Sequence, residues 1–333
     1  LYPSLRGVGL EWKNTECDSL LSFSTQIDGY KSRVRAAADA NDIMFAEEVL
    51  GAQELSSKDS SINQIYLIST PQELAWLSLA VNSGMRSAHC EFILTANIDL
   101  SGRFFTPIGQ SEQTAFCGVF NLNGHTISGL TIDNLSYTYA GLFGWTSNAY
   151  IINGYVKDAF VKVESSTSTA NMFVGTVVGY ANNTTIKNIS VSTAVLAKNV
   201  GKVYVGGVAG YVSGTIQYKM ENIISRPSTK TLSAGENYID LSDYSTRIYE
   251  EDSTSGASKL KDVSINIGGI SLSERVFAGG IVGFMSNYNS EATLAGMSYC
   301  TNESNVVAMS VGSQPANVYG GGVAGYLANQ MAI

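Results

Sequence analysis

The sequence has few of the residues on which common enzymes and metal sites depend. Its 333 residues include only two histidines, His89 and His125, and four cysteines without a Cys-x-x-Cys pair. It contains no His-Glu-x-x-His, Gly-x-Ser-x-Gly, P-loop or Asp-x-Asp-x-Asp-Gly motif. These absences argue against zinc-peptidase, hydrolase, nucleotide and calcium sites of the usual kinds. We therefore expect no catalytic residue, no metal and no cofactor.

Charge, proline and long apolar runs are also scarce. Charged residues make up 14% of the chain, against a usual ~25%, and there are five prolines. No apolar run approaches the ~18 residues of a membrane-spanning helix. The net charge of -8 argues against nucleic acid as a partner, because binding to phosphates needs a basic surface. What remains is an acidic, glycine-rich and apolar chain, which favours a β-rich fold over disorder.

The cysteines and the chain ends carry weaker signals. We expect Cys17, Cys90, Cys117 and Cys300 to be free thiols, with a Cys90–Cys117 bridge as the alternative. The sequence begins at Leu1 without a basic and then apolar leader segment, which is compatible with removal of a signal peptide. The chain ends at Ile333, soon after a motif that recurs upstream, so we expect further repeats of the same polypeptide beyond it.

The chain divides near residue 62. Residues 1–62 are predicted as a helical N-terminal segment, with an amphipathic helix over Gln26–Leu50. In the second part, residues 63–333, a helix is predicted over residues 71–82. Thr70 and Glu73 form a capping box around its start, and Pro71 stands at its first position. We expect this helix to cap the front of a β-rich domain.

An internal repeat is the strongest signal. A pentad with glycines at its first and fourth positions and an aromatic residue at its fifth occurs four times, and a fifth copy has Thr176 in place of the first glycine. Successive fourth-position glycines are 35, 31, 73 and 42 residues apart, and we interpret the long step as one unit plus an insertion at about 226–262. The repeat positions are Gly141, Gly144, Trp145, Gly179, Tyr180, Gly207, Gly210, Tyr211, Gly280, Gly283, Phe284, Gly322, Gly325 and Tyr326.

The repeat predicts a right-handed parallel β-helix. Units of 31 to 42 residues cannot bury an apolar face alone, but stacked units cover one another. The glycines would lie where the chain bends or packs closely, and the aromatic residues would stack from unit to unit. Asn153, Asn188 and Asn222 trail three of the pentads and would form a side-chain ladder along the axis. Leucine-rich repeats and WD40 blades fit worse, because their signatures are absent.

From residue 64 onward the sequence resembles GLUG-motif proteins. The resemblance rests on segments 66–74, 94–100, 106–109, 116–120 and 123–127, which occur in the family's order, and on the pentads themselves. It departs from the family pattern at Asn121-Leu122, which stand before Asn123-Gly124-His125, and at Thr176. The resemblance implies a bacterial protein of the cell surface or a secreted one. It also implies a β-helical region with an adhesive or scaffolding role.

Two functions remain open from the sequence. The first is a non-enzymatic adhesin or scaffold that binds a host or matrix glycan or protein, with Tyr238, Tyr244 and Tyr249 of the insertion as candidate binding residues. The second is a polysaccharide-active enzyme, which would need paired carboxylates; the candidates are Asp99, Asp133, Asp158 and Glu164. A third possibility is a non-catalytic stalk of a larger surface enzyme.

Overall fold

A computed structural model gives the fold of residues 53–56, 64–134, 136–215, 218–228, 266–287, 296–311 and 316–328. The predicted helix over Gln26–Leu50, Cys17 and the tyrosines Tyr238, Tyr244 and Tyr249 lie outside these described residues. In the segment 1–62, residues 53–56 form strand β1 (Gln53–Ser56). It pairs antiparallel with β2 (Gln64–Ile68), so this part of the segment belongs to the sheet that follows.

The protein is mainly β, with three sheets that are parallel apart from the β1–β2 pair. This confirms the β-rich, parallel class expected from the repeat. The largest sheet has 13 strands. They are β1, β2, β3 (Cys90–Leu94), β4 (Ile98–Asp99), β5 (Val119–Asn121), β6 (Thr126–Ser128), β7 (Thr131–Asn134), β10 (Tyr150–Glu164), β13 (Thr185–Asn199), β16 (Lys219–Pro227), β17 (Ile267–Ser271), β20 (Gly296–Asn302) and β21 (Val306–Ser310).

The other two sheets have five strands each, and none of the three sheets closes on itself over the described residues. The β8 sheet contains β8 (Tyr139–Ala140), β11 (Met172–Gly175), β14 (Val203–Gly206), β18 (Val276–Gly279) and β22 (Val318–Gly321). The β9 sheet contains β9 (Phe143–Ser147), β12 (Val178–Asn182), β15 (Ala209–Gly214), β19 (Val282–Asn287) and β23 (Ala324–Ala328).

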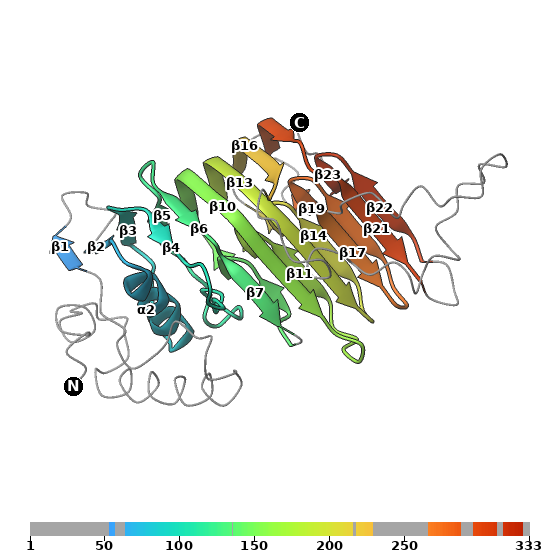
Figure 1. Cartoon of the computed structure of the whole chain (residues 1–333), viewed down its shortest axis with the longest axis horizontal. Helices are drawn as coiled ribbons and strands as arrows, with labels where there is room; N and C mark the ends of the chain where they lie inside the picture. The colour runs from blue at the N-terminus through green and yellow to red at the C-terminus, as the bar shows by residue number, and fades with distance from the viewer. Residues whose placement is uncertain are drawn as a thin grey trace.

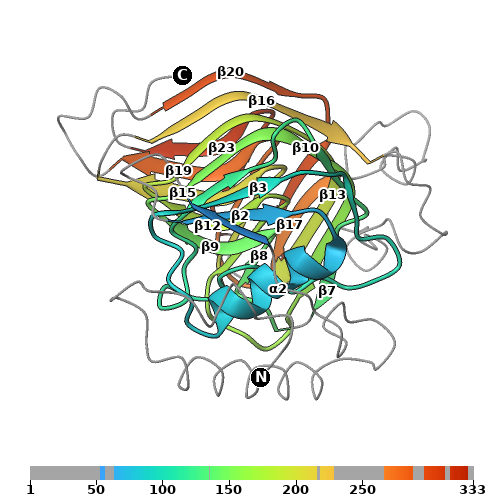
Figure 2. The same ribbon diagram turned by 90° about the vertical axis from the view of Figure 1, so that its left-hand side faces the viewer.

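The chain visits the three sheets in turn, and each visit adds a strand beside the previous one. From β10 it passes through β11 and β12 and returns in β13, which pairs with β10. The strands therefore succeed one another along the long axis in Figure 1, and Figure 2, which looks along that axis, shows them stacked behind one another. Tyr211 pairs with Tyr180 on one side and with Phe284 on the other. The 73-residue step is thus a single step in the sheets.

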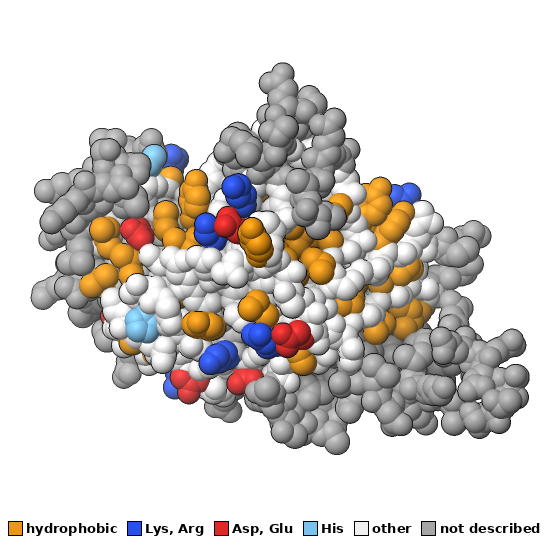
Figure 3. Space-filling model, turned by 90° about the horizontal axis from the view of Figure 1, so that it is seen from above, with side chains coloured by type: hydrophobic (Ala, Val, Ile, Leu, Met, Phe, Trp, Pro, Cys, Tyr) orange, Lys and Arg blue, Asp and Glu red, His pale blue; other side chains and the backbone are white. Residues whose placement is uncertain are grey.

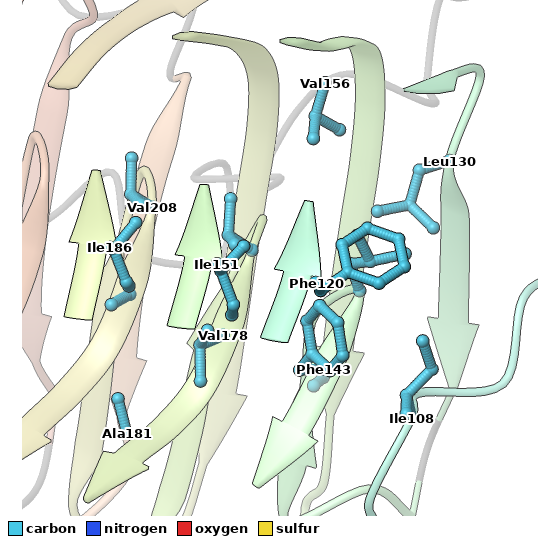
Figure 4. Close-up of a cluster of buried hydrophobic side chains, with 14 of the residues drawn as sticks. Ile108, Phe120, Leu130, Phe143, Ile151, Val156, Val178, Ala181, Ile186 and Val208 are labelled. Atoms are coloured by element: carbon cyan, nitrogen blue, oxygen red, sulfur yellow. The ribbon is translucent and has the colours of Figure 1, made fainter. Parts of the chain in front are cut away.

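Alternation along each strand directs one set of side chains into a shared core. Phe120, Ile151 and Ile186 are register partners on β5, β10 and β13, and all three are fully buried. Figure 4 shows them in line, with Val178 and Phe143 of the β9 sheet facing them. Burial of each such side chain stabilises the fold by roughly 1.5–3 kcal/mol. The axial stacking of equivalent residues is therefore what holds successive units together.

Helix α2 (Pro71–Asn82) is the helix that the sequence predicts, and it is the only helix among the described residues. The capping box is present: the Thr70 hydroxyl accepts from the Glu73 amide at 3.2 Å, and the Glu73 carboxylate accepts from the Thr70 amide at 3.0 Å. Trp76 is buried, and its ring centroid lies 6.1 Å from that of Tyr66 on β2. The helix lies at the N-terminal end of the stacked strands (Figure 1).

The 15-residue strand β13 shows where the long segment between β16 and β17 departs. Thr193 of β13 pairs with Pro227, the last residue of β16, and Val195 pairs with Ile267, the first residue of β17. One strand of one unit is therefore matched by two strands of the next. The intervening residues, which include most of the predicted insertion at 226–262, leave and return at neighbouring positions along β13.

Close approach explains the fourth-position glycines, and one hydrogen bond explains the departure at Thr176. A Cβ on Gly210 would lie 2.6 Å from the Val174 amide nitrogen and 2.8 Å from the Tyr204 carbonyl oxygen, so only glycine fits. Thr176 is fully buried, and its hydroxyl donates to the Thr193 hydroxyl at 2.6 Å. Threonine is accommodated there because a buried polar partner faces it.

Candidate ligand-binding groove

A row of asparagines crosses the 13-stranded sheet. Asn153, Asn188 and Asn222 lie on β10, β13 and β16, each between two residues that are paired in register with the next strand. Their φ values are 64°, 55° and 55°. This left-handed conformation suits asparagine better than other non-glycine residues. The recurring local bend turns each amide outward from the strand, so that the three amides align.

The amides of this row bind one another. The Asn222 Nδ2 donates to Asn188 Oδ1 at 3.0 Å, and the Asn188 Nδ2 donates to Asn153 Oδ1 at 2.9 Å. Asn153 in turn donates to Asn121 Oδ1 at 3.4 Å. A side-chain amide carries two donor hydrogens and an oxygen that can accept twice. Because the row uses one donor and one acceptor site of each inner amide, donors and acceptors remain to be offered to solvent or a ligand.

The asparagine row forms one wall of an open groove with a volume of about 310 Å³. Among its lining residues, Gly124 faces open space without a side chain, Gly154 packs its Cα against Leu122, and Ser190 adds a hydroxyl. Tyr155, which is 45% exposed, also lines it. The groove is lined by Gly124, Asn153, Gly154, Tyr155, Asn188, Ile189, Ser190, Asn222 and Ile224. It therefore combines neutral amides, a hydroxyl and an accessible aromatic ring.

The charges around the groove are largely paired. Lys187 and Glu221, register partners on β13 and β16, form an ion pair of 3.2 Å beside the asparagine row. On the other side, Arg226 binds Glu303 at 3.2 Å and donates to the Ser190 hydroxyl at 3.3 Å. In the view of Figure 3 the middle of this face is mostly uncharged, with isolated charged side chains to either side. The groove is thus close to neutral.

A second repetitive feature, the aromatic crease, lies between the β8 and β9 sheets. The pentad residues Trp145, Tyr180 and Tyr211 stack with ring centroids 4.1 and 4.9 Å apart, and Phe284 and Tyr326 continue the stack. A second column on the β8 sheet stacks in the same way and meets the first edge-to-face; it contains Tyr139, Phe173, Tyr204, Phe277 and Tyr319. These rings cover one another, which makes the crease a packing element rather than an open surface.

Sequence reasoning found the pentad column and the asparagine row but missed two other features. The second aromatic column carries a sequence signal, since an aromatic residue stands two positions before Gly175, Gly206, Gly279 and Gly321. Tyr155 carries no such signal, because its equivalents on the neighbouring strands are Ser190 and Ile224. Only the register of the sheet brings it beside the amides.

The candidate carboxylates of the enzyme hypothesis do not line the groove. Asp99 accepts from the Ser101 amide at 3.0 Å, and the hydrogen bonds from Ser101 lower its pKa. Asp133 is exposed, yet local desolvation raises its pKa, while neighbouring Lys162 acts in the opposite direction. Lys162 also pairs with Glu164 at 3.3 Å.

The described residues also include the remaining carboxylate candidate, three of the cysteines and the regions searched for metal ligands and membrane-spanning helices. Asp158 lies on β10, three residues after Tyr155, and has a φ of 52°. Its backbone amide donates to Ser192 Oγ at 2.9 Å. Within the same ranges no cluster of three potential metal ligands occurs, and no helix is long and apolar enough to cross a membrane. Cys90, Cys117 and Cys300 carry free thiols.

Comparisons with known proteins give partial likenesses. No protein-family model matches the chain. Halomucin from Haloquadratum walsbyi is 33% identical over 143 residues, which are 40% of this chain and 1% of Halomucin. The chain thus spans a very small part of that relative's length. A crystal structure described as a "putative immunoglobulin A1 protease" from Bacteroides ovatus is 15% identical, covering 81% of this chain and 84% of that one. Its TM-score of 0.37 supports no argument about fold or activity.

Proposed function

We propose that the units wind as a right-handed parallel β-helix with GLUG-like repeats. The support is the parallel register of equivalent residues in all three sheets, which advances one strand per unit. Right-handed crossover is the default for parallel connections. Such a rod exposes the same sequence position at each step of about 4.8 Å, and so it builds linear rows of identical groups.

On this rod, the chain acts as a non-enzymatic adhesin or scaffold at the bacterial cell surface or in secreted form. Its ligand is a glycan that lies in the groove beside the asparagine row. The observation that carries the proposal is the combination of aligned, partly unsatisfied amides with the exposed ring of Tyr155. The partial likeness to a protein named Halomucin is compatible with a surface or secreted location.

The chemistry of the groove suits carbohydrate. Each sugar hydroxyl both donates and accepts hydrogen bonds, and each amide of the row can offer both a donor and an acceptor. A tyrosine ring supplies a flat apolar surface at low cost in side-chain entropy. Lys157, whose Nζ lies 5.6 Å from the ring centroid of Tyr155, holds a cation beside this ring. Wet, polar contacts of this kind give specificity without a deep pocket.

The alternative of a polysaccharide-active enzyme has less support. Inverting hydrolysis needs two carboxyl groups roughly 6.5–9.5 Å apart, facing the same bond. Asp99 and Asp133 stand on separate strands, β4 and β7, and neither lines the groove. The hydrogen bonds to Asp99 come from its own turn, which gives that carboxylate a structural role.

Glycan arrays followed by calorimetry test the proposal. The wild-type chain is expected to bind a subset of immobilised glycans, and Tyr155→Ala is expected to weaken that binding about tenfold, as the loss of roughly 1.4 kcal/mol. Tyr150→Ala is the matched control, because Tyr150 is 52% exposed on the same strand but does not line the groove. No glycan bound above background, or an equal loss in both variants, would contradict the proposal. Binding to a protein ligand alone would do the same.

A further inference from the structure

The fourth position of the asparagine row holds an aromatic residue. Strand β20 pairs with β16 so that Ser298 faces Glu221 and Cys300 faces Ile223. Tyr299 therefore occupies the place that follows Asn222 in the row. Its side chain is 82% exposed, the largest exposed fraction among the described large apolar side chains. The row that runs through three amides thus ends in an accessible ring.

The backbone at this position favours asparagine, not tyrosine. The φ of Tyr299 is 53°, close to the 55° of Asn222. Asparagine adopts this conformation readily, whereas a bulky aromatic residue there is a rare and strained case. Over the described residues no other aromatic ring packs against Tyr299, so packing does not offset the strain. A strained residue without a packing role points to a role in function.

We propose that Tyr299 is the second aromatic platform of the groove, and that the groove's ligand is a neutral, linear glycan lying along the asparagine row between Tyr155 and Tyr299. This inference rests on the function proposed above. Tyr155 lies on β10 and Tyr299 on β20, three strand spacings apart across the sheet and two residues apart in register, or about 16 Å in all. The ligand is therefore an oligosaccharide of several units, with amide contacts in the middle and a ring stacked near each end.

The neutrality of the ligand follows from the charges beside the groove. Lys187 is paired with Glu221, and Arg226 is paired with Glu303. An acidic polysaccharide needs a run of unpaired cations, whereas among the described residues Lys157 beside Tyr155 is an isolated cation at the groove. Binding of a neutral glycan is also expected to change little with salt, since screening acts on charges.

Calorimetry with cellohexaose, chitohexaose, xylohexaose and a hyaluronan hexasaccharide tests the inference. For whichever neutral hexasaccharide binds best, Tyr299→Asn is expected to weaken binding about fivefold to tenfold. Tyr299→Phe, which keeps the ring, is expected to bind within about twofold of wild type. Because the two platforms are more than ~10 Å apart, the double variant with Tyr155→Ala is expected to lose the product of the single factors.

Thermal melting separates this effect from loss of the fold. Tyr299→Asn restores the residue that the backbone favours, so it is expected to melt at the wild-type temperature or above. Equal binding by Tyr299→Asn and wild type would overturn the inference while leaving the proposed function standing, as would equal losses in Tyr299→Asn and Tyr299→Phe. Preference for hyaluronan with steep salt dependence would overturn the neutral ligand. Absence of binding to every saccharide would instead overturn the proposed function itself.

Discussion

Gly210→Ala tests the close approach between the β8 and β9 sheets. The added Cβ would lie 2.6 Å from the Val174 amide nitrogen, 2.7 Å from the Gly179 carbonyl oxygen and 2.8 Å from the Tyr204 carbonyl oxygen. Ordinary contacts to carbon are about 3.5–4.0 Å long, so each of the three is short by roughly 0.7 Å or more. All three neighbours are backbone atoms and cannot swing aside. The sheets must therefore move apart locally.

The change in the free energy of unfolding combines two opposing contributions. Overpacking of this kind costs about 1–3 kcal/mol, and sometimes more. Alanine in place of glycine returns about 0.4–1 kcal/mol by restricting the unfolded chain. We expect Gly210→Ala to lower the free energy of unfolding by up to about 2.6 kcal/mol. The same displacement should disturb the rings of Tyr204 and Tyr211, which meet edge-to-face at 5.2 Å in the aromatic crease.

Gly320→Ala is the control, at a glycine of β22 in the β8 sheet. Gly320 pairs with Ala278 on the neighbouring strand, and a Cβ there would meet only the Ala308 Cβ, at an ordinary 3.7 Å. This variant is expected to be more stable than wild type by about 0.4–1 kcal/mol. Urea unfolding followed by circular dichroism, with equal slopes for the variants, measures both. Equal stability of the two variants would refute the close-approach argument.

Three further predictions concern buried polar groups, the helix cap and a thiol. Thr176→Val leaves the Thr193 hydroxyl buried and unpaired and should cost about 1–3 kcal/mol, whereas the Thr176→Val/Thr193→Val double variant should be nearly neutral in urea unfolding; equal costs would contradict this. Thr70→Ala should destabilise the protein by about 0.5–2 kcal/mol, while no change in the unfolding midpoint would argue against a stabilising cap. Burial raises the pKa of the Cys117 thiol, so the thiolate fraction near pH 8.5 is smaller in the folded protein than in the unfolded one. Alkylation of the Cys117 peptide, followed by mass spectrometry, should therefore be slower in the native protein than in urea, and the reverse order would be inconsistent with burial.

Local pattern was sufficient to predict the elements that repeat. The pentad aromatics stack because equal spacing from a glycine places Trp145 and Tyr180 at the same point of neighbouring strands. The capping box at Thr70 was equally predictable, since it depends on residues three positions apart. Asn222 follows its glycine by three residues more than Asn188 does, yet both lie in one row. The hydrogen bond between the two amides shows the shared row, which sequence spacing alone could not show.

The asparagine row of the groove recurs and was predicted, but the aromatic residues beside it could not be predicted because they do not recur. Tyr155 and Tyr299 are single departures from the repeat, at positions where the neighbouring strands carry serine, isoleucine or asparagine. A search for periodic signals passes over such residues, and only the register of the sheets shows that both stand beside the asparagine row. The structure thus separates two kinds of information. Residues that recur with the repeat specify the stacked strands, and residues that depart from the repeat distinguish one unit from another.

The departure of the chain between β16 and β17 has a consequence for how such a protein can vary. The Ser228 amide donates to the Thr193 carbonyl at 3.1 Å, and the Val195 amide donates to the Asn266 carbonyl at 2.7 Å. Both ends of the intervening segment are therefore held by one strand, at positions two residues apart. Lengthening a loop with fixed ends costs little, about 0.6 kcal/mol for each doubling. Whole segments can therefore be exchanged at this junction without shifting any pairing on either side, which makes it a natural grafting point for new recognition sequences.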